Sequence, residues 1–323
     1  MMKTIRWGII GPGKMARKFA QTVANLPQCE IAAVCGRSME KAQAFAEEFC
    51  IPHAFCSNEA MAALDEIDAV YIATPHPSHF PCAEFYIKAG KHILCEKPLC
   101  VNAYQAERLL ALAEEHHTFL MEGMWVRFLP VMRKMKELLE SGVIGEIRRL
   151  QSSICSAVPK ECARMYRNDL AGGALLDTGI YTLDFARTFL GEPNSITAFG
   201  DVRGGVDYQT AMTLCYDGGV IAELSTAMDH RAPMDAYIFG TLGYLRLPTL
   251  FAAEEVYLKI GKEPEIRYDC PRNGTGFEGE ILEVCRCIEQ GKLQSDTLPM
   301  TDTIAILKQM DEIRRQIGLH YDE

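Results

Sequence analysis

The N-terminal part of the chain alternates two hydrophobic patterns, which predict strands separated by helices. Short apolar runs rich in β-branched residues are typical of buried strands, and segments with an apolar residue at every third or fourth position are typical of helices. The expected strands lie near Ile5–Ile10, Glu30–Cys35, Ala69–Ala73, His92–Cys95 and Thr118–Met121. The expected helices lie near Lys14–Asn25, Met39–Phe49, Ser78–Ala89 and Ala103–His116. This alternation indicates βαβ units and a parallel sheet with helices on both faces.

Beyond Met121 the pattern changes to strands that follow one another closely. The expected strands lie near Glu146–Ala157, Ser195–Val202, Gln209–Tyr216, Val220–Met228, Ala236–Gly240 and Tyr244–Leu247. The expected helices lie near Leu129–Ser141, Ala174–Leu190, Phe277–Gln290 and Ile304–Ile317. Strands separated mostly by turns predict an α+β arrangement built on a large, mostly antiparallel open sheet.

The length of the chain, 323 residues, exceeds what one hydrophobic core usually fills and so predicts two domains. We expect residues 1–123 to form an α/β dinucleotide-binding domain with a doubly wound parallel (Rossmann) sheet. Residues 124–323 are expected to form an α+β domain for substrate binding and oligomerisation, whose last helix can pack back on the domain interface.

The composition is that of a globular protein and excludes several functional classes. Hydrophobic residues make up 48% and charged residues 24% of the chain, an ordinary mixture. The formal net charge of -10 argues against a nucleic-acid surface, which needs a basic footprint. No apolar run approaches the ~18 residues of a membrane span, and the first strand leaves no room for a signal peptide. We therefore expect a cytoplasmic protein without nucleic-acid or membrane partners.

The thirteen cysteines form no recognisable framework of disulfides or metal ligands. An odd number cannot all pair within the chain, no CxxC motif occurs, and many lie in apolar runs, as Cys35, Cys95 and Cys215 do. We expect reduced thiols in the core and no metal site.

The turn after the first strand has a glycine pattern typical of nucleotide binding. Its residues are Gly11, Pro12, Gly13, Lys14, Met15 and Ala16. Gly11 permits a tight turn, Gly13 lets the backbone approach a pyrophosphate, and Ala16 lets helix and strand pack closely. The helix that follows offers N–H groups and a partial positive charge to the anion. Residues 11–15 are therefore predicted to bind a dinucleotide; the alternative is a plain structural turn.

The end of the second strand decides which dinucleotide is expected. An NAD enzyme usually has Asp or Glu there to bind the ribose 2′-hydroxyl, whereas this chain has Arg37 and Ser38. A guanidinium and a hydroxyl suit a 2′-phosphate, so we expect NADP rather than NAD. The alternative is that Arg37 is a solvated loop residue and Ser38 only an N-cap.

Two further segments follow strands, at the edge where open α/β sheets bind ligands. Their predicted cofactor-binding residues are Thr74, Pro75, His76 and His79 in one segment and Glu96 and Lys97 in the other. Pro98 restricts the backbone of Lys97 and so helps to aim the ammonium at a cofactor ring. The alternative for Glu96 and Lys97 is a solvated salt bridge.

These motifs, together with the segment GGALLDTGIY from Gly172 to Tyr181, resemble the glucose-fructose oxidoreductase, inositol dehydrogenase and MocA-type (Gfo/Idh/MocA) family. The resemblance covers essentially the whole chain. Within the family the chain is most similar to the dimeric dihydrodiol dehydrogenase branch, which also oxidises D-xylose with NADP. Tyr181 stands where sugar and inositol dehydrogenases usually have His, and that branch has Tyr there as well.

The resemblance implies that Lys97, Asp177 and Tyr181 are catalytic. At i, i+4 spacing on a helix, Asp177 and Tyr181 project from one face. Lys97 would accept or relay the alcohol proton while hydride leaves to the nicotinamide, Asp177 would orient Lys97, and Tyr181 would hydrogen-bond the reacting oxygen. Taken singly, Asp177 could be a helix-start carboxylate and Tyr181 a core aromatic. Trp125 and Arg127 are weaker candidates for lining the substrate pocket.

We therefore expect an NADP-dependent oxidoreductase that acts on a CH–OH group of a sugar, such as an aldopentose, or of a cyclic vicinal diol. The first alternative is a non-catalytic regulator that senses NADP with the same fold, and the second is a nicotinamide-dependent glycosidase. Family members commonly dimerise through the C-terminal sheet, so the resemblance also implies a homodimer.

Overall fold

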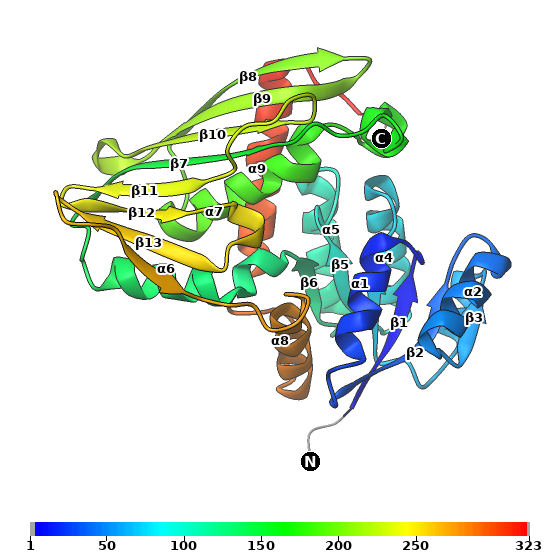
Figure 1. The fold of residues 1–323 in the computed structure, drawn as a ribbon. Coiled ribbons are helices and arrows are strands. Elements are labelled where there is room, and N and C mark those ends of the chain that lie inside the picture. Colours follow the sequence, from blue (N-terminus) through cyan, green and yellow to red (C-terminus); the bar gives the residue numbers. More distant parts are fainter. Residues whose placement is uncertain (1–3, 322–323) are drawn as a thin grey trace. The chain divides into compact units, whose positions relative to one another are not determined.

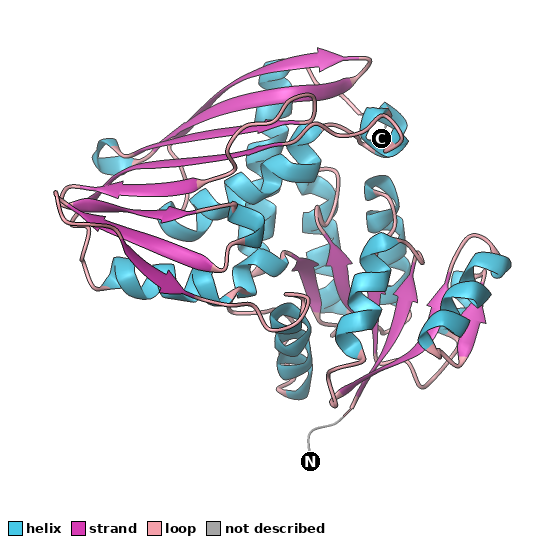
Figure 2. Ribbon diagram, in the orientation of Figure 1, coloured by secondary structure: helices cyan, strands magenta, loops and turns pink. Residues whose placement is uncertain are grey.

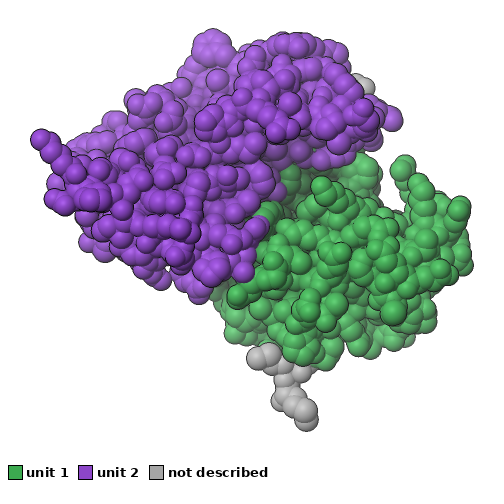
Figure 3. All heavy atoms as spheres, viewed as in Figure 1, with its two compact units in different colours: residues 1–127, 273–304 green, residues 128–272, 305–323 purple. Residues whose placement is uncertain are grey.

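The computed structural model describes residues 4–321, and the chain divides into two compact units (Figure 3). Unit 1 comprises the chain up to residue 127 together with residues 273–304, and unit 2 comprises residues 128–272 and the chain from residue 305 onward. The second segment of unit 1 lies in the range that the sequence analysis assigned to the second domain. It bonds to the other segment of unit 1 through the backbone, since Leu120 N–H donates to the carbonyl of Leu293 at 3.0 Å.

Unit 1 contains a six-stranded sheet in which every described pair of neighbours is parallel. Its strands are β1 (Ile5–Ile10), β2 (Cys29–Cys35), β3 (His53–Phe55), β4 (Ala69–Ile72), β5 (His92–Glu96) and β6 (Leu120–Gly123). The order β3-β2-β1-β4-β5-β6 is that of doubly wound dinucleotide-binding sheets, as predicted (Figure 1). The strand order reverses between β1 and β4, so a ligand crevice is expected at their carboxyl ends.

Polar side chains cap several helices of unit 1. The helices are α1 (Lys14–Val23), α2 (Met39–Phe49), α3 (Asn58–Ala62), α4 (His79–Lys88), α5 (Ala103–Glu115) and α8 (Glu278–Glu289). The side chains of Ser38 and Asn102 accept hydrogen bonds from the N–H groups of Lys41 and Gln105, at 3.4 and 2.9 Å. These bonds satisfy N–H groups that have no partner inside the helix.

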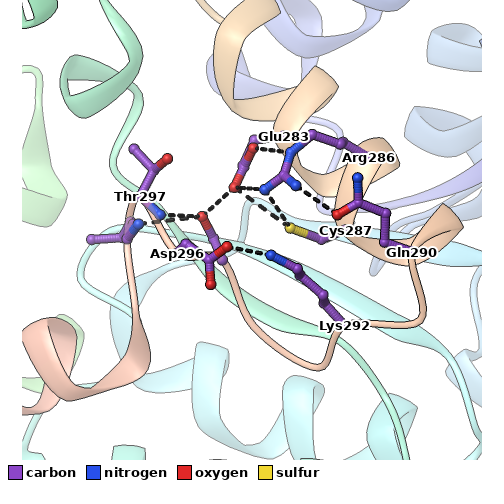
Figure 4. Close-up of polar contacts among 9 residues, drawn as sticks. Glu283, Arg286, Cys287, Gln290, Lys292, Asp296 and Thr297 are labelled. Atoms are coloured by element: carbon purple, nitrogen blue, oxygen red, sulfur yellow. Dashed lines mark hydrogen bonds and ion pairs between the residues drawn. The ribbon is translucent and has the colours of Figure 1, made fainter.

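A polar network fixes the chain that follows α8 (Figure 4). Glu283 accepts hydrogen bonds from Arg286 at 2.7 and 2.8 Å and from the hydroxyl of Ser295 at 2.5 Å. The same hydroxyl accepts from the N–H groups of Thr297 and Leu298. Burial alone would raise the pKa of Glu283, but the bonds from Arg286 and Ser295 outweigh it and the pKa is lowered. The ionised carboxylate therefore holds the turn that leads to the next helix.

Unit 2 contains an eight-stranded sheet that is mostly antiparallel, as predicted (Figure 2). Its strands are β7 (Ile147–Cys155), β8 (Ser195–Arg203), β9 (Val206–Cys215), β10 (Ile221–Ala227), β11 (Ala236–Gly240), β12 (Gly243–Leu247), β13 (Glu255–Ile260) and β14 (Ile266–Asp269). The order is β14-β13-β12-β11-β7-β10-β9-β8, and among the described pairs only β7 and β10 run parallel. The sheet is open, with β14 and β8 at its edges.

Helices cover one face of this sheet. They are α6 (Pro130–Glu140), α7 (Ile180–Leu190) and the part of α9 (Met300–Ile317) that belongs to unit 2. Helix α7 packs on β7 and β10, and Gln316 on α9 bonds to the backbone of Ala198 and Ile196 on β8, at 2.7 and 2.9 Å. Side chains on the other face line a hollow of about 820 Å³.

All thirteen cysteines are free thiols. Cys35 and Cys95 are buried as expected, but Cys215 is exposed, so its prediction was wrong. The alternation along β9 turns Cys215 away from the core. Within residues 4–321, no helix is long and apolar enough to cross a membrane, and no three His, Cys, Asp or Glu side chains are grouped to hold a metal ion.

Candidate active site

The turn between β1 and α1 has the geometry that a dinucleotide pyrophosphate needs. Gly11 has a φ of +85°, and a Cβ there would lie 2.9 Å from the carbonyl oxygen of Ala73 on the neighbouring loop. Gly13 is the N-cap of α1, no side chain caps the helix, and a Cβ there would meet nothing closer than 4.0 Å. The first N–H groups of α1 are therefore open to an anion. These residues fit the cofactor that the sequence analysis expects.

The end of β2 lies beside this turn. Gly11 N–H donates to the carbonyl of Cys35 at 2.9 Å, and a Cβ on Gly36 would touch the ring of Pro12 at 3.0 Å. Arg37 follows and is exposed, as are Gly13 and Lys14, whereas Met15 is half-buried. Ser38 caps α2, which is the structural role that the sequence analysis gave as its alternative. Arg37 is thus placed next to the glycine turn, and its contact with a 2′-phosphate stays a prediction.

The segments after β4 and β5 are tied together by His79, the first residue of α4. Its ring nitrogens Nδ1 and Nε2 lie 2.8 Å from the carbonyl oxygens of Pro98 and Thr74 respectively. His76 in the short helix η1 (His76–Ser78) is also buried, and the centroids of the two histidine rings are 5.9 Å apart. Lys97 itself is half-buried and precedes a cis bond to Pro98. Thr74 and the loop of Glu96, Lys97 and Pro98 therefore lie side by side at the carboxyl edge of the sheet.

Glu96 is a buried acid rather than part of a solvated pair. The residue is 5% exposed, and its carboxylate accepts a hydrogen bond from the hydroxyl of Tyr71 on β4. Burial raises the pKa of Glu96, against the opposing effects of the Tyr71 bond and of the charge on Lys97. The alternative of a solvated Glu96–Lys97 salt bridge does not fit this burial. Glu96 faces the protein interior, so its contact with a cofactor stays a prediction.

Glu122 at the end of β6 is a site residue that sequence reasoning missed. It is 1% exposed, its Oε1 accepts from Leu99 N–H at 2.8 Å, and its Oε2 accepts from the hydroxyl of Thr303 at 3.1 Å. The carboxylate thus holds the loop that contains Lys97. The sequence feature that could have identified Glu122 is an acid within the apolar strand LMEG. A carboxylate is buried only when it has hydrogen-bond or charged partners.

The two weaker substrate candidates make contacts within unit 1. The ring of Trp125 packs against Phe277 at 5.7 Å, with Lys18 Nζ 3.9 Å from the Trp125 ring centroid. Arg127 Nη1 lies 2.8 Å from a carboxylate oxygen of Asp302, and the Arg127 side chain is only 6% exposed. Both residues thus help to pack the two segments of unit 1, and their place in a substrate pocket stays a prediction.

In unit 2, Asp177 lies in a π-helical turn, η5 (Leu175–Gly179), and Tyr181 lies in the first turn of α7. The helix predicted over 174–190 is confirmed in extent, but its π turn was not predicted. Such turns add a residue to the helix and are frequent at functional sites. Both side chains are half-buried, and Asp177 Oδ1 lies 2.9 Å from Arg164 Nη2. Asp177 therefore has a cationic partner that the sequence analysis did not name.

Asp207 on β9 fixes the start of this helical segment. Its Oδ2 accepts from Leu175 N–H and from the hydroxyl of Thr210, both at 2.9 Å. Gly173, with a φ of +109°, lies so close that a Cβ there would overlap the Asp207 carboxylate, and a Cβ on Gly172 would lie 2.6 Å from the backbone of Arg164. Burial raises the pKa of Asp207 to about 6, although these hydrogen bonds oppose the rise.

The C-terminal residues also hold the segment. The hydroxyl of Tyr321 donates to the carbonyl of Gly172 at 2.8 Å. Asn168 Nδ2 lies 2.6 Å from the carbonyl oxygen of Gly205 and 2.7 Å from that of His320. Nothing in the local sequence around the glycines indicates these distant partners.

Each unit thus contains its own group of the predicted site residues. Unit 1 brings together the glycine turn, the end of β2, Thr74, His79 and the loop with Lys97. Unit 2 places Asp177 and Tyr181 on one supported helical segment, with Arg164 from the preceding η3 (Ala163–Tyr166) paired to Asp177. Because Lys97 lies in one unit and Asp177 and Tyr181 in the other, their action on one substrate stays a prediction.

Comparison with known proteins identifies related sequences over nearly the whole chain. A family model described as "Oxidoreductase family, NAD-binding Rossmann fold" matches residues 5–124, and one described as "GFO/IDH/MocA C-terminal domain" matches residues 132–246. The trans-1,2-dihydrobenzene-1,2-diol dehydrogenase of Xenopus tropicalis is 34% identical over 329 residues, which cover 98% of this chain and 99% of the relative. The human protein of the same name is 31% identical, with 99% and 98% covered.

Solved structures have the same architecture. The 3-ketoreductase KijD10 from Actinomadura kijaniata, in complex with NADP and TDP-benzene, matches with a TM-score of 0.89 and 27% identity over 98% of each chain. The aldose-aldose oxidoreductase from Caulobacter crescentus, complexed with glycerol, matches with a TM-score of 0.90 and 22% identity over 98% of each chain, which shows a shared fold.

Proposed function

Because the chain belongs to the Gfo/Idh/MocA family of oxidoreductases, we propose that it transfers hydride between NADP and a carbinol or carbonyl carbon of a sugar or a cyclic vicinal diol. One observation carries the proposal: the glycine turn, Thr74 and the Lys97 loop lie along one edge of a parallel sheet, where the strand order reverses. A nucleotide turn and a lysine at the same edge suit proton transfer beside a bound nicotinamide.

The roles of the residues follow from their chemistry. A bound nicotinamide supplies the hydride acceptor or donor. Gly11 and Gly13 let the backbone approach the pyrophosphate, and Lys97 takes the proton from the substrate hydroxyl or returns it to a carbonyl oxygen. Tyr181 hydrogen-bonds the same oxygen. Asp177 orients the amine of Lys97, with its own position set by Arg164.

The preference for NADP rests on Arg37. The residue is exposed beside the glycine turn, no acid follows β2 at the place where an NAD enzyme binds the ribose, and KijD10 is described in complex with NADP. A guanidinium can donate two parallel hydrogen bonds to a phosphate.

The substrate class rests on the relatives. Two are named trans-1,2-dihydrobenzene-1,2-diol dehydrogenase, and KijD10 is a 3-ketoreductase. The first name describes a dehydrogenase of a cyclic vicinal diol, and the second describes reduction of a keto group. We therefore place this chain's substrate among cyclic polyols and sugars.

The experiment is a coupled test of turnover and binding. Purified protein is mixed at alkaline pH with NADP, or separately with NAD, and with a panel of aldopentoses and cyclic vicinal diols. The absorbance of reduced nicotinamide should rise with NADP and at least one substrate. Tight NADP binding without turnover across the panel would favour the regulator, and nitrophenol release from nitrophenyl glycosides without net cofactor consumption would favour the glycosidase.

A cytoplasmic homodimer through the C-terminal sheet is part of the same proposal. One face of that sheet is not covered by helices of the described chain; it lines the hollow of about 820 Å³, and Phe199 on β8 is 76% exposed beside it. An exposed aromatic side chain on an open sheet suits a self-complementary contact. Light scattering should give the mass of a dimer for the wild type and of a monomer for Phe199→Glu, and a monomeric wild type would contradict the proposal.

A further inference from the structure

The two contacts of the His79 ring constrain its protonation. His79 is fully buried, and Nδ1 and Nε2 lie 2.8 Å from the carbonyl oxygens of Pro98 and Thr74 with hydrogen-bond geometry at both nitrogens. A carbonyl oxygen only accepts hydrogen bonds, and a neutral imidazole has a proton on one nitrogen only. In either neutral tautomer, one nitrogen would therefore point its lone pair at a carbonyl oxygen. Both contacts are favourable only when both nitrogens bear protons.

We propose that His79 is held as an imidazolium, which donates to Thr74 and Pro98 and so fixes the loop of Lys97. His79 would be a positioning residue for the proposed reaction, and this role rests on the proposed function. Compared with a neutral ring, which makes one hydrogen bond and one repulsive contact, the cation makes two charge-assisted hydrogen bonds, each about twice as strong as a neutral one. One of the two hydrogen bonds goes to the carbonyl of Pro98, directly after Lys97. This bond limits the movement of the Lys97 amine.

A buried cation needs nearby groups that offset its desolvation. The titratable and charged groups on the surrounding elements are Tyr71 on β4, His76 on η1, Cys82, Glu84, Tyr86 and Lys88 on α4, His92, Cys95 and Glu96 on β5, Lys97 and Cys100 after it, Tyr104, Glu107, Arg108, Glu114 and Glu115 on α5, and Glu122 on β6. Glu122 is the acid tied to the same loop, because its carboxylate accepts from Leu99 N–H at 2.8 Å. His79 and Glu122 thus hold adjacent backbone groups, one by donating and one by accepting.

The direct test is the protonation of the ring in the wild-type protein. Long-range ¹⁵N–¹H spectra of uniformly labelled protein, with NADP added, report both ring nitrogens of each of the eight histidines. The signals missing from His79→Gln identify His79. We expect both nitrogens of His79 to stay protonated from pH 6 to about pH 8, above the range in which an exposed histidine titrates. Loss of one ring proton near pH 6.5, as in an exposed histidine, would overturn the proposal.

A pair of variants tests the positioning role. The amide nitrogen of Asn can take the place of the donor Nδ1, and that of Gln can take the place of Nε2, so His79→Asn and His79→Gln each keep one bond. We expect each to lower kcat about ten- to hundredfold with little change in the KM for NADP, since a misplaced catalytic group costs on this order. His116→Gln, on the exposed end of the following helix, is the control and should match the wild type.

The NMR spectra and the kinetic measurements test the charge on His79 and the proposed function separately. The NMR spectra need no turnover, so a wild type without activity would reject the proposed function while still deciding the charge on His79. An unchanged kcat in both His79 variants of an active enzyme would overturn the positioning role.

Discussion

The two units support their proposed catalytic residues in different ways. In unit 1, the Lys97 loop follows a parallel strand and is held by His79 on helix α4 and Glu122 on strand β6, which both bond to its backbone. In unit 2, the segment with Asp177 is held by Asp207 and Tyr321, which are 30 to 144 positions away along the chain. The first kind of site follows from the order of strands and turns, whereas the second depends on contacts between distant parts of the sequence.

The largest effect is expected in unit 1, from Lys97→Met. The substitution removes the only group assigned to carry the proton and keeps a side chain of similar length. We expect kcat to fall by about 10²- to 10⁴-fold, the usual contribution of a positioned acid or base. The dissociation constant for NADP, measured by calorimetry, should stay nearly unchanged.

Lys88→Met is the matched control for Lys97→Met. Lys88 lies at the end of α4 in the same unit, and its exposed ammonium pairs with Glu84. This variant should keep full activity, because exposed ion pairs contribute little. Turnover by Lys97→Met at the wild-type rate would show that unit 1 does not supply the proton carrier.

The next largest effect is expected on the choice between NADP and NAD, which we assign to unit 1 alone. Arg37→Ala removes the proposed 2′-phosphate partner, so NADP should bind about ten- to hundredfold more weakly, in keeping with the loss of a charged hydrogen bond. NAD binding should change little. Arg108→Ala, an exposed arginine on α5 paired with Glu84, is the control. An equal loss for NAD and NADP would reject Arg37 as the phosphate ligand.

A smaller effect is expected in unit 2 from replacing Asp207. The substitution changes the stability of the folded protein and the dependence of that stability on pH. The folded-state pKa is raised from its ordinary value of 3.8 to about 6, so the folded protein binds the proton more tightly than the unfolded chain does. The contribution of Asp207 to stability is therefore complete below about pH 4 and falls as the pH rises towards about 6. Asp207→Asn should remove this part of the slope in thermal unfolding curves.

Asp207→Ala serves as the companion to Asp207→Asn. It also removes the acceptor for Leu175 N–H, which should cost about 1–3 kcal/mol at neutral pH. A wild-type pH slope that survives in Asp207→Asn would show that another group is responsible.

The smallest effect is expected from Arg164→Ala. The guanidinium is half exposed, so its ion pair with Asp177 contributes at most about 1 kcal/mol. We expect kcat/KM to fall by no more than about fivefold, with the change mainly in kcat. Arg148→Ala, which breaks the exposed pair with Glu146 in the same unit, should have no effect. A loss as large as that of Lys97→Met would make Arg164 a catalytic residue in its own right.

Much of unit 1 could be predicted because residues close together in the sequence indicate each of its elements. Apolar runs, helix caps such as Ser38, and the glycine turn identify β1, β2, β4, β5 and β6 with the helices between them. The exception is β3 with the short α3 that follows it. The strand has three half-buried residues, His53–Phe55, and so lacks an apolar run of its own.

The fold class of unit 2 could be predicted from the sequence, but some of its strands and side-chain contacts could not. The strands β7–β12 follow from their alternation, but β13 and the edge strand β14 were missed, since charged residues such as Glu255, Lys259 and Arg267 interrupt them. The position of Asp177 was predicted from a motif. Its partner Arg164 and the support from Asp207 and Tyr321 were not, because these contacts exist only once the sheet, the loop and the C-terminal residues have folded together.

The most direct test of the central claim is a crystal structure of the protein with NADP and a polyol substrate bound. We expect Lys97 Nζ and the Tyr181 hydroxyl both to lie within about 3.2 Å of the same substrate oxygen, beside the nicotinamide ring. A structure in which the amine of Lys97 points into solvent, away from that ring, would contradict the account.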